Sequence, residues 1–196
     1  MEKSNIKPRF SVRQIAMIGM LSSISIFLGL TGLGFIPIPP VKATIMHIPV
    51  IIGAIVEGPI VGALVGLVFG LFSMYQAFTT PLPTSFLFWN PIIALIPRIL
   101  IGVVAYYVYI LLRNVIKKQS ISIGIAALCA TLTNTIGVLG LAYLIYLDRY
   151  SAALGIDKAI AGTTIATIGV TNGIPEAIVS AVICIPVIIA IQKMKK

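Results

Sequence analysis

Arg98 is the residue of this sequence whose type and position most strongly indicate a functional site. It lies in the run 90–104, which otherwise reads as a membrane-spanning helix. A guanidinium keeps its charge under ordinary conditions, and placing it at the centre of a bilayer costs roughly 2.5–3.5 kcal/mol on insertion scales. Such a residue usually faces a polar cavity or the interior of a bundle, together with a partner or an anionic ligand. Arg98 therefore predicts a polar site between helices.

Further polar residues fall at a similar depth in neighbouring apolar segments. Asn172 and Glu176 are four residues apart, and they therefore share one face of a helix. Arg98 and Glu176 could form a structural ion pair, or one or both could contact a ligand. The other candidates for ligand contact are Asn134, Tyr75, Gln76, His47, Trp89, Asn90 and Lys42. Because these groups come from several segments, they predict a pocket that combines apolar walls with a few placed polar groups.

Several of these residues also have a purely structural interpretation. Asn134 and Asn172 could hydrogen-bond neighbouring helices, and Trp89 could be an interfacial anchor of the aromatic belt. His47 is expected to be a hydrogen-bonded polar residue rather than a metal ligand, because it is the only histidine and the two cysteines lack ligand spacing. We therefore expect neither a metal site nor a bound cofactor.

The composition indicates the class of protein that must position these residues. Of the 196 residues, 59% are hydrophobic and only 10% are charged, whereas a soluble domain carries about 25% charged residues. About 20 helical residues cross a hydrocarbon core of ~30 Å, and several apolar segments are that long. The expected fold is all-α: one domain, residues 1–196, forming an integral membrane bundle of six spans. The spans are expected at residues 11–32, 45–57, 60–78, 91–112, 121–147 and 162–191.

Details of these spans predict how they pack. The second span is short, because thirteen helical residues rise only about 20 Å, so its neighbours must support it. In the third span Gly62, Gly66 and Gly70 recur every four residues and place a smooth stripe on one face. The segment 148–161 is expected to be a loop or a surface helix, with its charged residues solvated.

The distribution of basic residues predicts an orientation. Of the 14 basic residues, ten fall before or at the start of the first span, between the fourth and fifth spans, or after the sixth. The positive-inside rule makes that face cytoplasmic, so both termini are expected in the cytoplasm. The polar candidates then lie mainly in the outer half of the bundle, which favours a pocket that opens outward.

Motifs that would indicate other functions are absent from the sequence. There is no GxxxxGK[ST] phosphate loop, no HExxH and no GxSxG nucleophile elbow, so we expect no catalytic residue. The net charge of +9 follows the membrane topology rather than a nucleic-acid surface. The chain looks too small for most secondary transporters. A membrane subunit that captures substrate and takes its energy from partners fits better.

The sequence resembles the substrate-binding S components of energy-coupling factor (ECF) vitamin transporters. The size, the six spans, the long first external loop and the small-residue character of the first span all match that family. The most specific match is the run 43–59, ATIMHIPVIIGAIVEGP, followed by GALVGLVFG at 62–70. It is similar to the family's HIPV-IGA-GP--GA--G--FG pattern across the second and third spans.

This resemblance implies a mechanism and a set of partners. An S component captures a vitamin outside the cell and docks on a membrane T component that carries two cytoplasmic ATPases, in the cell membrane of a prokaryote. Family members commonly use an Ala-x-x-x-Ala face of the first span for docking. Here Ala16 is followed at the fourth place by Met20, and Gly19 and Ser23 form an adjacent small pair. The expected docking face is therefore Ala16, Gly19 and Ser23.

Within the family, this chain looks most like the members assigned to pantothenate. Arg98 suits that substrate, because a guanidinium can clamp a carboxylate through two hydrogen bonds. Riboflavin, folate and cobalamin remain alternatives; Trp89, Phe86 and Phe88 would suit the stacking that riboflavin needs. A standalone proton-coupled carrier, using Glu176, is an alternative from another class, and an intramembrane enzyme or a purely structural subunit is less well supported by the residues.

Overall fold

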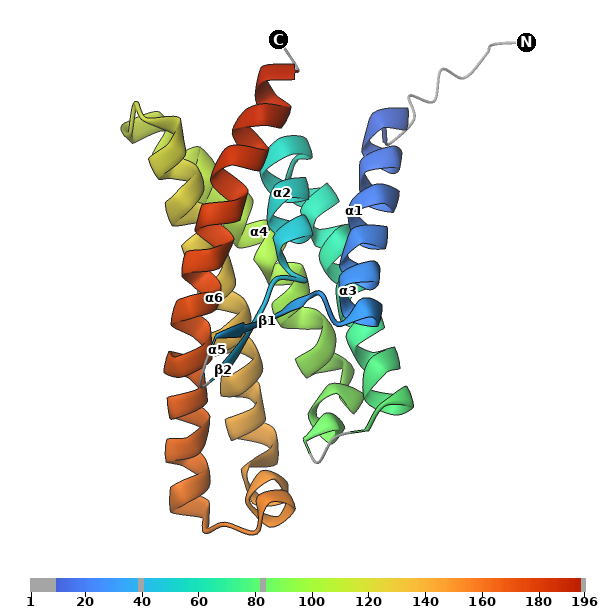
Figure 1. Cartoon of the computed structure of the whole chain (residues 1–196), viewed down its shortest axis with the longest axis vertical. Coiled ribbons are helices and arrows are strands. Elements are labelled where there is room, and N and C mark those ends of the chain that lie inside the picture. The colour runs from blue at the N-terminus through green and yellow to red at the C-terminus, as the bar shows by residue number, and fades with distance from the viewer. Residues whose placement is uncertain (1–9, 39–40, 82–83, 195–196) are drawn as a thin grey trace, which may run out of the picture.

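The computed structural model describes residues 10–38, 41–81 and 84–194, and these form six α-helices, one short 3₁₀ helix and a two-stranded hairpin. Figure 1 shows the helices as one bundle, with α1 beginning and α6 ending at the same end of it. The helices are α1 Val12–Thr31, α2 Ile48–Glu57, α3 Pro59–Thr79, α4 Pro91–Val115, α5 Gln119–Leu154 and α6 Lys158–Met194. Which end faces the cytoplasm stays a prediction.

The ends of α1 agree with the first expected span. Ser11 forms a capping box with Gln14, in which each side chain bonds the backbone N–H of the other residue, and Gly32 ends the helix with a φ of 73°. A left-handed residue at this position suits glycine, which has no Cβ to clash. The first expected span is therefore confirmed to within a residue at each end.

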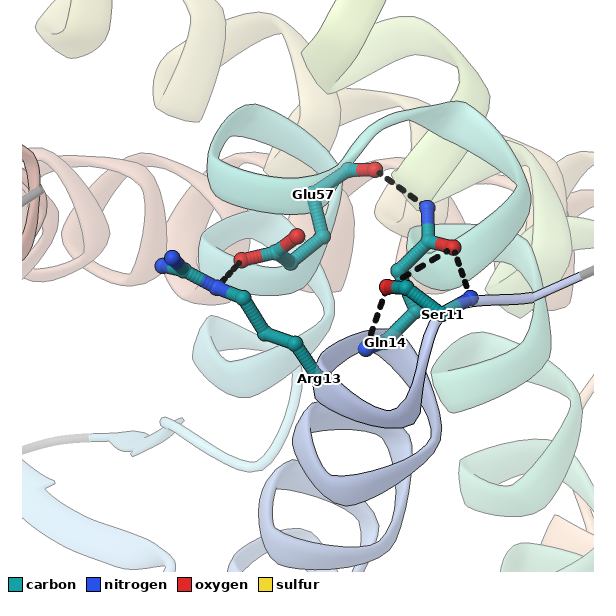
Figure 2. A network of polar contacts seen from close by, with 4 residues as sticks. All are labelled: Ser11, Arg13, Gln14 and Glu57. Atoms are coloured by element: carbon teal, nitrogen blue, oxygen red, sulfur yellow. Dashed lines mark hydrogen bonds and ion pairs between the residues drawn. The ribbon is translucent and has the colours of Figure 1, made fainter.

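The N-terminus of α1 is tied to the C-terminus of α2, as Figure 2 shows. The Arg13 Nε donates to a carboxylate oxygen of Glu57 at 2.8 Å, and the Gln14 side-chain amide donates to the Glu57 carbonyl at 3.5 Å. Arg13 and Gln14 thus link the start of the first helix to the turn at Gly58, and Ser11 bonds Gln14.

The second span is the least like an ordinary membrane helix. α2 has only ten residues, which rise about 15 Å, and its residues Ile48–Val56 are all buried. It is therefore the apolar centre of the bundle. Among the described residues, five other helices are long and apolar enough to cross a membrane. Six helices are confirmed, but α2 cannot cross a bilayer by itself.

The glycine stripe of α3 lies against α4. A Cβ added at Gly66 would stand 2.2 Å from the backbone oxygen of Arg98, and one at Gly70 would stand 2.6 Å from that of Ala94. At Gly62 an added Cβ would meet Ala54 of α2 at 2.5 Å. Gly66 and Gly70 therefore let α3 approach the α4 backbone closely at the level of Arg98, and Gly62 lets it approach α2; the predicted smooth stripe is the surface that makes these contacts.

The segment 148–161 differs from expectation. α5 continues to Leu154 across a kink at Tyr146, and α6 begins at Lys158, so only three residues separate two helices of 36 and 37 residues. Lys158 and Asp148 do form an exposed ion pair of 2.7 Å. Arg149 is exposed as well, and its guanidinium carbon lies 4.5 and 5.5 Å from the ring centroids of Phe86 and Trp89.

The first loop contains a β-hairpin that the all-α prediction lacks. Strand β1, Phe35–Ile38, pairs antiparallel with β2, Val41–Thr44, in the register Phe35 to Thr44. Strand β2 packs on α6. A second short element, the 3₁₀ helix η1 at Ser85–Trp89, lies in the expected loop between α3 and α4 and contacts both helices. These two elements bring loop residues to the site.

Candidate functional site

A cavity of about 290 Å³ lies where the hairpin, α3, η1, α4 and α5 meet. It contains Arg98, Gln76 and Asn134 of the predicted polar residues. The lining residues are Phe35, Thr44, Met46, Phe69, Ser73, Gln76, Ala77, Thr80, Ser85, Phe88, Arg98 and Asn134. Mostly apolar walls with a few polar groups are the usual character of a small-molecule site.

Arg98 is buried, with 5% of its surface exposed. Its Nη1 donates to the carbonyl of Ile93 at 2.8 Å. Pro97 explains why that carbonyl is available: proline has no N–H, so the residue four places earlier loses its helical hydrogen bond. The Arg98 Nε is buried without a partner. The Arg98 side chain is thus held by one hydrogen bond within the protein, and its Nε–H remains unpaired.

Two aromatic rings and no carboxylate accompany the guanidinium. Its carbon lies 4.8 Å from the centroid of Phe88 and 5.7 Å from that of Phe69. Ring faces attract a cation, but they do not neutralise its charge. Neither of the two ion pairs among the described residues includes Arg98. The structural ion pair between Arg98 and Glu176 is therefore not formed.

Glu176 instead bonds to the hairpin. Its Oε1 accepts from the backbone N–H of Thr44 at 2.9 Å and from the Thr44 hydroxyl at 2.7 Å. Thr44 lines the cavity, whereas Glu176 does not. The carboxylate therefore reaches the site only through Thr44, by holding the end of β2 against α6.

His47 joins three helices in the interior. It is 1% exposed, and its Nε2 lies 3.0 Å from the hydroxyl of Thr131 in α5 and 2.7 Å from that of Ser180 in α6. It does not line the cavity. No group of three possible metal ligands occurs in the described part of the chain. The geometry of His47 is that of a hydrogen-bonded core residue, as the structural interpretation expected.

Asn134 lines the cavity too, and its Oδ1 is buried without a hydrogen-bond partner. Gln76 lines the cavity beside it and has one long bond, from its amide nitrogen to the carbonyl of Gly29 at 3.5 Å. Together with Arg98, these residues supply both donors and acceptors to a bound molecule.

Four other predicted residues lie outside the cavity lining. Tyr75 is 59% exposed, and Trp89 bonds the carbonyl of Ala77 and stacks on Phe78. Asn90 caps α4 by accepting from the N–H of Ile92. The Asn172 amide oxygen has only a 3.4 Å contact with its neighbour Thr171. The side chain of Lys42 lies outside the described residues.

The predicted docking residues share an open face of α1. Ala16, Gly19 and Ser23 are all exposed, and a Cβ added at Gly19 would meet nothing within 4 Å. The Ser23 hydroxyl donates to the carbonyl of Gly19 at 2.8 Å. This face of α1 is therefore smooth, and the proton of the Ser23 hydroxyl is bonded within the helix.

Several lining residues were missed by sequence reasoning, although a signal for some of them exists. Phe69, Ser73, Gln76 and Thr80 recur at helical spacing along one face at the C-terminal end of α3. Only Gln76 was predicted. Phe35 and Thr44 reach the cavity through the pairing of the hairpin, and no periodic pattern in the sequence shows that.

Comparison with known proteins identifies the family. Residues 13–188 match the family model described as ECF transporter, substrate-specific component. The pantothenic acid transporter PanT of Lactococcus lactis subsp. cremoris is 35% identical over 170 residues, which cover 80% of this chain and 81% of that protein. The pantothenate transporter PanT of Leuconostoc mesenteroides subsp. mesenteroides is 36% identical over 114 residues, covering 54% and 55%. The chain is thus a multi-pass protein of a bacterial cell membrane, and it belongs to the family of ECF transporter substrate-specific components.

Proposed function

We propose that this protein is the pantothenate-binding subunit of an ECF importer and that it holds the vitamin in the cavity around Arg98. The observation that carries the proposal is a buried guanidinium that lines a cavity, forms no ion pair and keeps an unpaired Nε. Pantothenate brings one carboxylate, one amide and two hydroxyls. The names of the two relatives support the same substrate.

The carboxylate is the part of the ligand that Arg98 recognises. One N–H of Nη1 donates to the Ile93 carbonyl and the Nε has no partner, so the guanidinium retains N–H groups that can donate to the carboxylate. Charge-assisted bonds from a guanidinium to a carboxylate are short and about twice as strong as neutral ones. The ring centroids of Phe69 and Phe88 lie 5.7 and 4.8 Å from the guanidinium carbon, and the rings attract the cation without accepting its N–H groups as a carboxylate would.

The size of the cavity also favours a small vitamin. Its 290 Å³ lies at the lower limit of the roughly 300–1,000 Å³ that is typical of small-molecule sites. Cobalamin is far larger than this volume. Riboflavin was an alternative substrate because three aromatic residues could stack on it. Of these, only Phe88 lines the cavity, while Phe86 and Trp89 lie outside its lining.

Transport requires partners that share the membrane and supply energy. The proposal includes docking of α1 on a T component that carries two ATPases, through Ala16, Gly19 and Ser23. Their exposure and the open space at Gly19 support this role, because small residues let two helices approach closely. The link from Arg13 and Gln14 to Glu57 fixes the start of this helix (Figure 2).

The test is a calorimetric titration of the purified protein, without ATP or partners. Pantothenate should bind at one site per chain, and panthenol, in which a neutral alcohol replaces the carboxylate, should bind much more weakly. Riboflavin, folate, biotin, thiamine and cobalamin serve as competitors of different shape. Tight binding of one of these in place of pantothenate would move the substrate assignment, and equal affinity for panthenol would contradict the role of Arg98.

A further inference from the structure

The hydrogen-bond direction at Thr44 follows from its geometry. One oxygen of Glu176 accepts from both the backbone N–H and the hydroxyl of Thr44. An N–H can only donate, so this oxygen is an acceptor whether or not the other carboxyl oxygen carries a proton. With no proton on this oxygen, the Thr44 hydroxyl donates to it as well. Its oxygen therefore keeps only acceptor capacity on the cavity side.

Two other hydroxyls of the cavity lining also donate their protons to acceptors of the protein. Ser73 donates to the carbonyl of Phe69 at 3.0 Å, and Thr80 donates to that of Gln76 at 2.9 Å. Carbonyls only accept, so these oxygens also offer acceptors. Such bonds back to the preceding turn are common in helices. The bond of Thr44 is different, because its partner lies 132 residues away on α6.

We propose that Thr44, oriented by Glu176, is a specificity-determining residue that accepts a hydrogen bond from a hydroxyl of the ligand. This inference rests on the proposed function and adds to it. Arg98 supplies donors for the carboxylate, and Thr44, with its proton already bonded, supplies an acceptor for a ligand donor. Glu176 is a positioning residue: it touches no ligand and sets the direction of the Thr44 hydroxyl.

This arrangement selects ligands by the direction of their hydrogen bonds. A hydroxyl on the ligand can donate to Thr44. A methyl ether at the same place has no proton to donate, so its oxygen and that of Thr44 are both acceptors. Each of these buried oxygens then lacks the hydrogen bond that it would form in water, which weakens binding. Carboxylates of similar size that lack the hydroxyl are therefore discriminated against, although Arg98 alone would accept them.

The experiment compares Thr44→Val with Thr44→Ser by calorimetry. Both variants keep the backbone N–H that bonds Glu176, so the hairpin keeps that contact, and only Val lacks the hydroxyl. The ligands are pantothenate and two analogues, each with one of its two hydroxyls replaced by hydrogen. Thr163→Val is the matched control, because this exposed α6 residue bonds only to carbonyls of its own helix and lies outside the cavity.

We expect Thr44→Val to weaken pantothenate binding about tenfold, the usual effect of one neutral hydrogen bond. Thr44→Ser and Thr163→Val should bind as the native chain does. For one of the two analogues the native chain and Thr44→Val should bind alike, because the missing hydroxyl is the one that Thr44 accepts from. An equal loss for pantothenate and both analogues would overturn the inference and leave the proposed function intact.

Glu176 provides a second readout that a structural role would not give. Glu176→Gln keeps an acceptor oxygen for Thr44, whereas Glu176→Ala frees the hydroxyl to rotate and donate. The affinity ratio of pantothenate to its methyl ether at the recognised hydroxyl should fall in the Ala variant and be retained in the Gln variant. An unchanged ratio in Glu176→Ala contradicts the positioning role. Failure of the native chain to bind pantothenate would refute the proposed function and, with it, this inference.

Discussion

The substitution Arg98→Ala tests the carboxylate clamp most directly. A hydrogen bond to a charged group contributes about 1.5–3 kcal/mol, and 1.4 kcal/mol is about tenfold in Kd. The Nε and a remaining N–H allow a two-point contact, because only Nη1 is occupied, by the Ile93 carbonyl. A loss of about 3 kcal/mol predicts that pantothenate binds roughly a hundredfold more weakly to the variant.

The assay pairs two ligands with two proteins. Calorimetry in detergent gives the Kd of pantothenate and panthenol for native protein and Arg98→Ala. The native chain should prefer pantothenate by about a hundredfold. The variant should bind the two ligands with similar affinity, because without the guanidinium neither ligand can form the guanidinium–carboxylate contact. If the variant keeps the native preference, the carboxylate lies elsewhere and the reasoning fails.

A control separates binding from folding. Arg98→Ala leaves the Ile93 carbonyl without its partner, which costs about 1–3 kcal/mol, but it also removes the cost of burying a charge. The variant should therefore stay folded, as judged by its melting temperature and by its elution from a sizing column. Arg113→Ala removes an exposed arginine near the end of the same helix and should leave both affinities unchanged.

Three further substitutions test packing and docking. Gly66→Ala should destabilise the protein by at least about 1–3 kcal/mol in thermal unfolding, because its Cβ would lie 2.2 Å from the Arg98 carbonyl oxygen; Gly140→Ala, where nothing lies within 4 Å, should be neutral or slightly stabilising. His47→Phe should cost about 1–3 kcal/mol, because it leaves the buried Ser180 hydroxyl unpaired, whereas Thr131 keeps its bond to the Ala127 carbonyl; an unchanged melting temperature would show that the His47 bonds contribute little. Gly19→Leu should retain pantothenate binding but lose co-purification with the T component and uptake, while Gly140→Leu should retain all three; normal co-purification of the first variant would disprove the docking face.

The helices were predictable because their signals are local. The apolar run 11–32 predicted α1 to within a residue at each end, and the four-residue spacing of Gly62, Gly66 and Gly70 predicted a smooth stripe on one helix face, which proves to be a close helix contact. The β-hairpin was not predictable in this way. Its strands are four residues each, too short for a periodic pattern, and its position depends on a contact between Thr44 and Glu176 that is remote in sequence.

Sequence reasoning found the site residues that are costly to bury in a membrane helix, and it missed those of types that are common in such helices. Arg98 is conspicuous in an apolar helix, and its place in the cavity agrees with expectation. Glu176 is equally conspicuous, but the distance between two helices decides whether it meets Arg98 or the hairpin, and sequence does not give that distance. Ser73 and Thr80 are commonplace in helices, so only their shared face with Gln76 marks them.

The pair Pro97-Arg98 explains how a charge can be buried here and still be free for a ligand. The proline frees the Ile93 carbonyl, and the next side chain takes it at 2.8 Å. A carbonyl and two ring faces fix the guanidinium in position, but they leave its charge uncompensated. A permanent carboxylate partner would have satisfied Arg98 and removed its preference for an anion. The carboxylate that could have done so, Glu176, bonds Thr44 instead, and this is why we propose Arg98 as the group that recognises an anionic ligand.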